Sequence, residues 1–158
     1  MAPKIHFGHD AFLVHVQDSH ILVGEGPSFM DVEIAAAIKP DGKEEKITCN
    51  SVLINKKKKG TVIQLADAVI SYVHDTVTAK EAKEYKSDVL ILAKPQEQLI
   101  IKIKPKLAVI MNSTVYTARE LNKKTDTQII AAQHGMTIDL ADYNALSKQK
   151  SLSKYQKP

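Results

Sequence analysis

The chain has 158 residues, 44% of them hydrophobic and 25% charged, which are ordinary proportions for a soluble globular protein. This length predicts a single domain that can bury its own core. No apolar run approaches the roughly 18 residues that a membrane-spanning helix needs, and polar residues interrupt the first ten positions, so we expect neither a membrane segment nor a signal peptide. A single cysteine, Cys49, excludes an internal disulfide framework. The simplest interpretation is a cytoplasmic protein.

The net charge is +4 and the pI is about 9.0, and all but one of the 22 basic residues are lysines. The exception is Arg119. Lysine acts as a point charge for phosphate, whereas the arginine fork suits base edges. A nucleic-acid role would therefore be directed at the backbone and strongly salt-dependent. The alternative, which the charge alone leaves open, is a domain that is merely basic.

The first part of the chain has strand-length apolar runs separated by turn residues. Residues Asp31–Ile38 fit either a strand or a helix, and a hairpin is predicted whose loop is Asn55–Gly60. The predicted strands are Lys4–Phe7, Ala11–Gln17, His20–Val23, Lys46–Ile54, Thr61–Leu65 and Ala68–Val73.

The second part alternates strands with helices. Thr78 and Glu81 form a capping box for a helix to about Tyr85, and Thr114 or Thr117 begins a helix through Lys124. A short helix is predicted at Pro95–Ile101 and a last one at Leu140–Ser147. The strands are Asp88–Leu92, Lys106–Met111, Thr127–Ala131 and Met136–Leu140. Antiparallel strands followed by βαβ units predict an α/β fold with a mixed sheet and outer helices, spanning residues 1–147, before a basic, flexible tail at 148–158.

Two stretches carry a resemblance to a known family. The first is Lys4–Pro27, with Gly8-His9-Asp10-Ala11-Phe12 and, after a hairpin, Ile21-Leu22-Val23-Gly24-Glu25-Gly26-Pro27. The second is Ile70–Leu140, with Val73-His74-Asp75-Thr76 and, near its end, Gly135-Met136-Thr137-Ile138-Asp139-Leu140. Both resemble the metallo-β-lactamase superfamily, in particular its archaeal-type hydrolases. The resemblance implies a truncated, single-domain αββα sandwich with mixed sheets.

The same resemblance implies zinc ligands that this chain lacks. The His-x-His-x-Asp-His motif is absent, Gly24-Glu25 stands where the family has its early Asp, and Asn112 stands at the final His. Only Asp75, at the position of the metal-bridging Asp, remains. Each zinc ion needs about four N, O or S donors. We therefore expect no enzymatic activity, no catalytic residues and no cofactor. The alternative is a residual metal-dependent hydrolase or nuclease with zinc at Asp75, His74 and Cys49.

Lysines supply the remaining candidate site. Lys56, Lys57, Lys58 and Lys59 form the predicted hairpin loop, which is either a solvated tip or a finger that contacts phosphates. Further lysines that favour a polyanion partner are Lys102, Lys104, Lys106 and, in the tail, Lys148, Lys150, Lys154 and Lys157. The prediction is a non-catalytic structural or binding subunit of an oligomer or of a ribonucleoprotein such as a ribosome. Its partners would be a protein or a second copy, and RNA or another polyanion.

Overall fold

The computed structural model describes residues 3–24 and 32–142. Its strands are β1 (Lys4–Phe7), β2 (Ala11–Val16), β3 (Ser19–Gly24), β4 (Ala36–Ile38), β5 (Glu45–Cys49), β6 (Val52–Lys56), β7 (Gly60–Gln64), β8 (Val69–Val73), β9 (Val89–Leu92), β10 (Leu107–Ile110), β11 (Gln128–Ala131) and β12 (Thr137–Asp139). The helices are the 3₁₀ helix η2 (Ala82–Tyr85) and the α-helices α1 (Glu97–Ile103) and α2 (Val115–Lys124).

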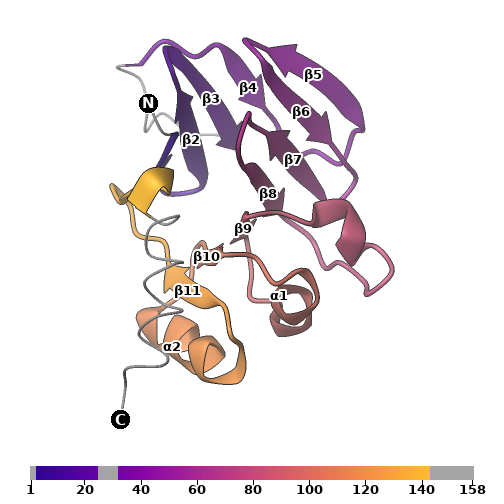
Figure 1. Ribbon diagram of the computed structural model, residues 1–158, viewed down its shortest axis with the longest axis vertical. Helices are drawn as coiled ribbons and strands as arrows, with labels where there is room; N and C mark the ends of the chain where they lie inside the picture. Colours follow the sequence, from indigo (N-terminus) through magenta and orange to yellow (C-terminus); the bar gives the residue numbers. More distant parts are fainter. Residues whose placement is uncertain (1–2, 25–31, 143–158) are drawn as a thin grey trace.

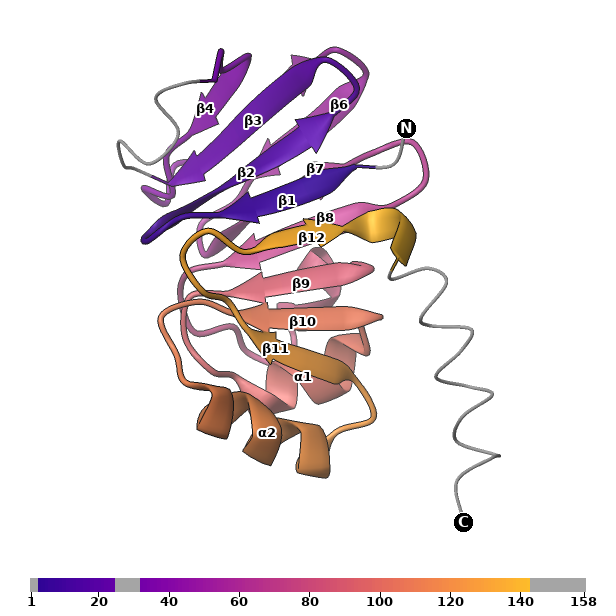
Figure 2. The ribbon, with the colours of Figure 1, turned by 90° about the vertical axis from the view of Figure 1, so that its left-hand side faces the viewer.

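The strands form two mixed sheets (Figures 1 and 2). The smaller sheet has the order β12-β1-β2-β3-β4, and the larger has the order β11-β10-β9-β8-β7-β6-β5. Strands β8 to β11 are parallel, whereas β5 to β8 pair antiparallel. The chain therefore switches from hairpins to βαβ units at β8, as the sequence predicted.

The main core lies between the two sheets. Alternate side chains of the smaller sheet, among them Phe12 and Ile21, meet Ile54, Ile70 and Ile91 of the larger sheet, and all five are fully buried. Alternation along a strand places every second residue on the same face, so one face of each sheet supplies this core.

A second core lies on the other face of the larger sheet. Leu90 of β9 and Ala108 of β10 pack there against Leu99 of α1 and Ala118 of α2. Figures 1 and 2 show both helices together at one end of the molecule, beside β9 to β11. Strands β9 and β10 are apolar throughout because they bury both faces. Helices α1 and α2 both pack on the larger sheet, and a helical turn begins at Leu140, directly after β12 of the smaller sheet.

Two predicted elements differ from the structure. The strand predicted at Lys46–Ile54 is a hairpin of β5 and β6, because Asn50 and Ser51 form a turn with φ values of 46° and 72°. The helix predicted from Thr78 is only the 3₁₀ helix η2. The predicted contact between Thr78 and Glu81 is nevertheless present, since the backbone N–H of Glu81 donates to the Thr78 hydroxyl oxygen at 3.4 Å. The predicted last helix extends beyond residue 142, where the described residues end, and the tail at 148–158 lies outside them.

No helix among the described residues combines the length and the apolar character that crossing a membrane requires.

Ser71 of β8 has an unusual environment. It is fully buried, and its hydroxyl has no hydrogen-bond partner among the described residues. Because an unsatisfied buried hydroxyl costs free energy, we expect Ser71→Ala to raise the free energy of unfolding by about 1 kcal/mol. Ser19 is the matched control, since its hydroxyl accepts a bond from Asn50 Nδ2. Urea denaturation should show that Ser19→Ala destabilises; a destabilised Ser71→Ala variant would contradict the reasoning.

Candidate functional site at the shared edge of the sheets

The carboxyl ends of several strands meet at one edge of the larger sheet. Strands β6, β8, β9 and β10 run in the same direction, because β6 and β8 are both antiparallel to β7. The chain therefore places Lys56, His74, Lys94 and Asn112 at or just beyond this edge. The β1–β2 turn of the smaller sheet lies beside it, since Asn112 Nδ2 donates to Asp10 Oδ1 across 3.4 Å. We call this region the shared edge.

An open cavity of about 570 Å³ lies at the shared edge. It is lined by Asp10 and Gly24 from the smaller sheet and by Lys39, Pro40 and Asp41 from the loop after β4. This arrangement brings together loops that are far apart in the sequence.

His74 follows β8 and is half-buried. Its ring centroid lies 6.1 Å from that of Tyr72, and its Nε2 atom is buried without a hydrogen-bond partner in the described structure. Burial lowers the pKa of His74, although Asp75 and Asp41 act in the opposite direction. Burial thus favours the neutral imidazole.

Asp75 points into solvent rather than into a ligand cluster. Its Oδ1 atom accepts the backbone N–H of Thr76 at 2.8 Å, and Lys94 Nζ lies 3.8 Å from it. The bond from Thr76 is the main reason that the pKa of Asp75 is lowered. Gln96 fixes this loop, because its Nε2 donates to the Asp75 carbonyl and its Oε1 accepts from Val77 N. Asp75 is thus an ionised, exposed carboxylate on a well-fixed loop.

These residues do not fit the zinc centre of the resembled family. Among residues 3–24 and 32–142, no group of three or more His, Cys, Asp or Glu side chains could hold a metal ion. Cys49 ends β5, whose other end, at Glu45, pairs with Lys56. It therefore lies at the opposite edge of the sheet from His74 and Asp75, and the structure does not bring the three predicted ligands together.

The lysine loop at Lys56–Lys59 is tied to acidic side chains. Lys56 is 6% exposed and its Nζ lies 3.0 Å from Asp41 Oδ1. Lys59 Nζ lies 2.7 Å from Glu81 Oε1, and Lys57 Nζ lies 3.8 Å from Glu84 Oε1. Only Lys58 is exposed and lacks a partner in the described part of the chain. Three of the four loop lysines are therefore paired with carboxylates of neighbouring segments.

The sequence analysis did not predict that Asp41, Glu81 and Glu84 pair with the lysine loop, although it named Glu81 in the capping box with Thr78. Sequence signals exist only for Glu81, through its spacing from Thr78. Of the other predicted lysines, Lys106 Nζ lies 3.9 Å from Asp88 Oδ1, whereas Lys102 and Lys104 are exposed on and beside α1. The tail lysines 148, 150, 154 and 157 lie outside the described residues. Binding of nucleic acid by any of these lysines stays a prediction.

The ion pair between Lys59 and Glu81 makes the stability of the protein depend on pH. The Lys59 ammonium and the N–H and hydroxyl of Thr78 lower the pKa of Glu81 from 4.5 to about 2. A depressed carboxyl pKa adds stability that is fully present above pH 4.5 and is lost as the pH falls toward 2. We expect Glu81→Gln to flatten the pH dependence of the unfolding midpoint in that window. Glu97→Gln is the control. An unchanged profile in Glu81→Gln would contradict a stabilising ion pair between Lys59 and Glu81.

Comparison with known proteins shows the fold. No family model and no curated protein sequence matches the chain. A candidate zinc-dependent hydrolase of the metallo-β-lactamase superfamily from Thermotoga maritima matches with a TM-score of 0.59 and 15% identity over 79% of this chain and 87% of its own. The metallo-β-lactamase fold protein YhfI from Bacillus subtilis matches with a TM-score of 0.64 and 10% identity over 88% of this chain and 100% of its own.

These neighbours correct one prediction. The sequence analysis inferred from the missing zinc ligands that the chain is not an enzyme, and the comparison contradicts this. The solved proteins that share the fold include a diphosphatase of the PhnP family and a candidate metal-dependent hydrolase from Veillonella parvula, with TM-scores of 0.58 and 0.62. The absence of particular zinc ligands was too narrow a basis for excluding enzymatic activity, because one fold can carry many different active sites. What the comparison establishes for this protein is its architecture: it has the metallo-β-lactamase fold.

Proposed function

We propose that this protein binds RNA or another polyanion through a face formed by the segment 80–86 and helix α1, as a subunit of an oligomer or a ribonucleoprotein. The face comprises five lysines, Lys80, Lys83, Lys86, Lys102 and Lys104, which we call the basic face. All five are exposed. The segment and α1 are in contact, so the five lysines belong to one part of the surface.

The observation that carries the proposal is the separation of charge within the segment. Its two acids are engaged elsewhere, because Glu81 binds Lys59 and Glu84 lies beside Lys57 of the loop. No basic-face lysine forms an ion pair with any residue of the described structure, unlike three of the four loop lysines. The loop thus neutralises the acids of the segment and leaves the segment's own lysines unpaired.

The chemistry of this face favours backbone contacts over base readout. Lysine ammonium groups bind phosphates without base specificity, and release of condensed counterions supplies the free energy. Exposed aromatic rings for base stacking are scarce, since aromatic residues make up only 5% of the sequence. A duplex, which presents phosphates at fixed spacing, is therefore the RNA form that we expect the face to bind.

Changing all five basic-face lysines to Gln tests the proposal. If the face contacts about four phosphates, the slope of log K against log salt should fall by roughly 3 to 4, and affinity near 50 mM salt should drop about 100-fold. Fluorescence anisotropy of a labelled RNA duplex across a salt series measures both. The control changes Lys43, Lys46 and Lys124 to Gln, which are exposed lysines elsewhere.

Two further variants separate the alternatives. Lys58→Gln tests the loop finger, and changing Lys148, Lys150, Lys154 and Lys157 to Gln tests the tail. An unchanged slope in the five-lysine variant, with a loss in either of these, would move polyanion binding away from the basic face. No RNA binding by the unaltered protein at low salt would refute the proposal.

A protein partner or self-association is part of the same proposal. Val115 and Tyr116, in the first turn of α2, are 52% and 69% exposed, and apolar side chains exposed side by side are common at interfaces. The mass of the particle in solution, measured by sedimentation with and without RNA, distinguishes a monomer from an assembly.

A further inference from the structure

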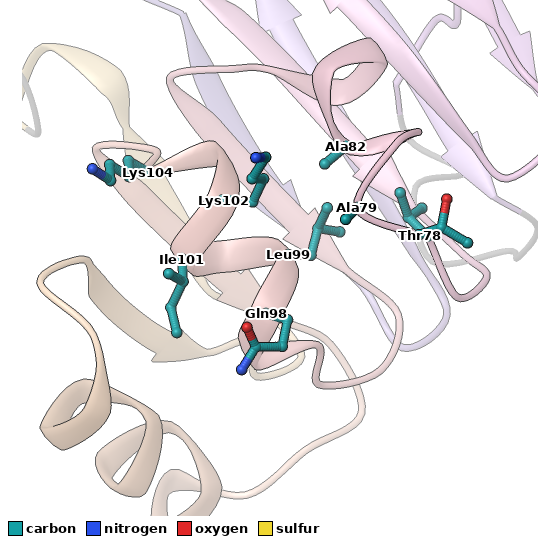
Figure 3. Close-up of a pocket in the computed structure, with 9 residues that line it drawn as sticks. Thr78, Ala79, Ala82, Gln98, Leu99, Ile101, Lys102 and Lys104 are labelled. Carbon is teal, nitrogen blue, oxygen red and sulfur yellow. The ribbon is translucent and has the colours of Figure 1, made fainter.

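A cavity of about 350 Å³ lies between helix α1 and the segment before η2 (Figure 3). This volume falls in the range of small-molecule sites. The cavity is distinct from the shared edge, because none of its residues lines the cavity there. Its lining residues are Val77, Thr78, Ala79, Ala82, Gln98, Leu99, Ile101, Lys102 and Lys104.

The floor of this cavity is apolar. Ala82 and Leu99 are 1% and 3% exposed, and Val77 is 9% exposed, so these side chains contribute a fixed hydrophobic surface. Figure 3 shows Leu99 projecting from α1 toward Ala79. At the rim, Ile101 is 40% exposed, a large fraction for an isoleucine. A ligand with an apolar body that covers the exposed part of Ile101 would remove apolar surface from water, which favours its binding.

The only charges in the lining are positive. Lys102 and Lys104 carry them, and neither has an ion-pair partner in the described residues. Lys102 projects from α1 toward the segment that carries Ala82 (Figure 3). The nearby carboxylate of Glu81 is already held by Lys59 and by Thr78. A negative group in the cavity would therefore meet an ammonium without displacing an internal partner.

We infer that this cavity binds a small organic anion with an apolar body, whose charged group contacts Lys102 and whose body packs on Leu99, Ala79 and Ala82. The backbone of a polyanion would contact the lysines but would make no favourable contact with the apolar floor of the cavity. This site therefore goes beyond the proposed function, although it shares Lys102 and Lys104 with the basic face. The two can be separated, because blocking the floor leaves the charges in place.

Titration calorimetry with decanoate and, separately, with inorganic phosphate tests the inference. We expect saturable binding of decanoate and at least tenfold weaker binding of phosphate, which lacks the apolar body. Ala79→Phe should fill the cavity and abolish decanoate binding, and Ala79 is exposed, so the change leaves the core intact. Lys102→Gln should weaken decanoate at least tenfold, whereas Lys80→Gln, which alters a lysine outside the lining, should not.

The outcomes separate this site from polyanion binding. Ala79→Phe should leave the salt slope of RNA binding unchanged, because it removes no charge. Loss of decanoate binding in Ala79→Phe therefore supports the cavity even if RNA does not bind. Equal binding of phosphate and decanoate, or decanoate binding that survives Ala79→Phe, would overturn the inference while leaving the proposed function standing.

Discussion

Replacing Gly60 by Ala should lower the free energy of unfolding by about 3 kcal/mol or more, because it forces an atom into filled space. Gly60 begins β7 at the lysine loop and is buried. A Cβ at this position would overlap the carbonyl oxygen of Tyr72 and lie 2.8 Å from Tyr85 Cε1. The oxygen belongs to the backbone of the neighbouring strand β8, so the overlap cannot be relieved by a side-chain rotation. Urea denaturation measures the loss.

Gly135→Ala is the matched control for Gly60→Ala. A Cβ at Gly135 would meet no atom within 4 Å, but the residue has a φ of +88°. Its substitution should therefore cost only the backbone strain, about 1 kcal/mol. If the two variants lose similar free energy, close packing of Gly60 against β8 is not the reason for glycine there.

Replacing Ile91 by Ala should lower the free energy of unfolding by about 4 kcal/mol. Ile91 is fully buried on β9, which lies between β8 and β10, and it faces the core between the sheets. The substitution loses the transfer free energy of three carbons and leaves a cavity that two packed sheets can close only in part.

Two controls bracket the Ile91 experiment. Ile91→Val removes one carbon and should cost about 1 kcal/mol. Ile101→Ala removes the same atoms from a side chain that is 40% exposed, so its cost should be well below that of Ile91→Ala. Thermal or urea unfolding compares the three, and equal losses for Ile91→Ala and Ile101→Ala would contradict the position of the core.

Local patterns predicted the parallel half of the larger sheet well. The apolar stretches Asp88–Leu92 and Lys106–Met111 are strands because a central parallel strand buries both faces and needs a continuous apolar run. Thr114 caps α2 as one of the two predicted starts, accepting the N–H of Thr117 at 3.1 Å. These features depend on neighbours in the sequence, so the sequence was sufficient to predict them.

Elements that depend on unusual backbone conformations were harder to predict. The turn between β5 and β6 uses Asn50 and Ser51 at positive φ, and neither Gly nor Pro marks it. Strand β4 is only Ala36–Ile38, and its place is set by parallel pairing with β3. Pairing between strands is a tertiary effect, which the alternation in Asp31–Ile38 could not reveal.

The candidate sites show the same division. Asp75 and Asn112, which the resemblance singled out, follow β8 and β10, and the carboxyl ends of these parallel strands lie at one edge of the sheet. The resemblance could not show that Lys56 pairs with Asp41 or Lys59 with Glu81, because these partners lie 15 and 22 residues apart and meet only in the folded chain. The lysine run was therefore the most conspicuous charge in the sequence and is among the most compensated in the structure.

That compensation leaves the basic face as a local concentration of positive charge within the described residues. Carboxylates neutralise most of the loop, whereas the five lysines of the basic face form no ion pair within the described residues. A charge distribution of this kind orients a protein during a diffusional encounter, before any contact forms. If the basic face binds a polyanion as proposed, we expect the rate of that encounter to fall as added salt shortens the range of the electrostatic attraction.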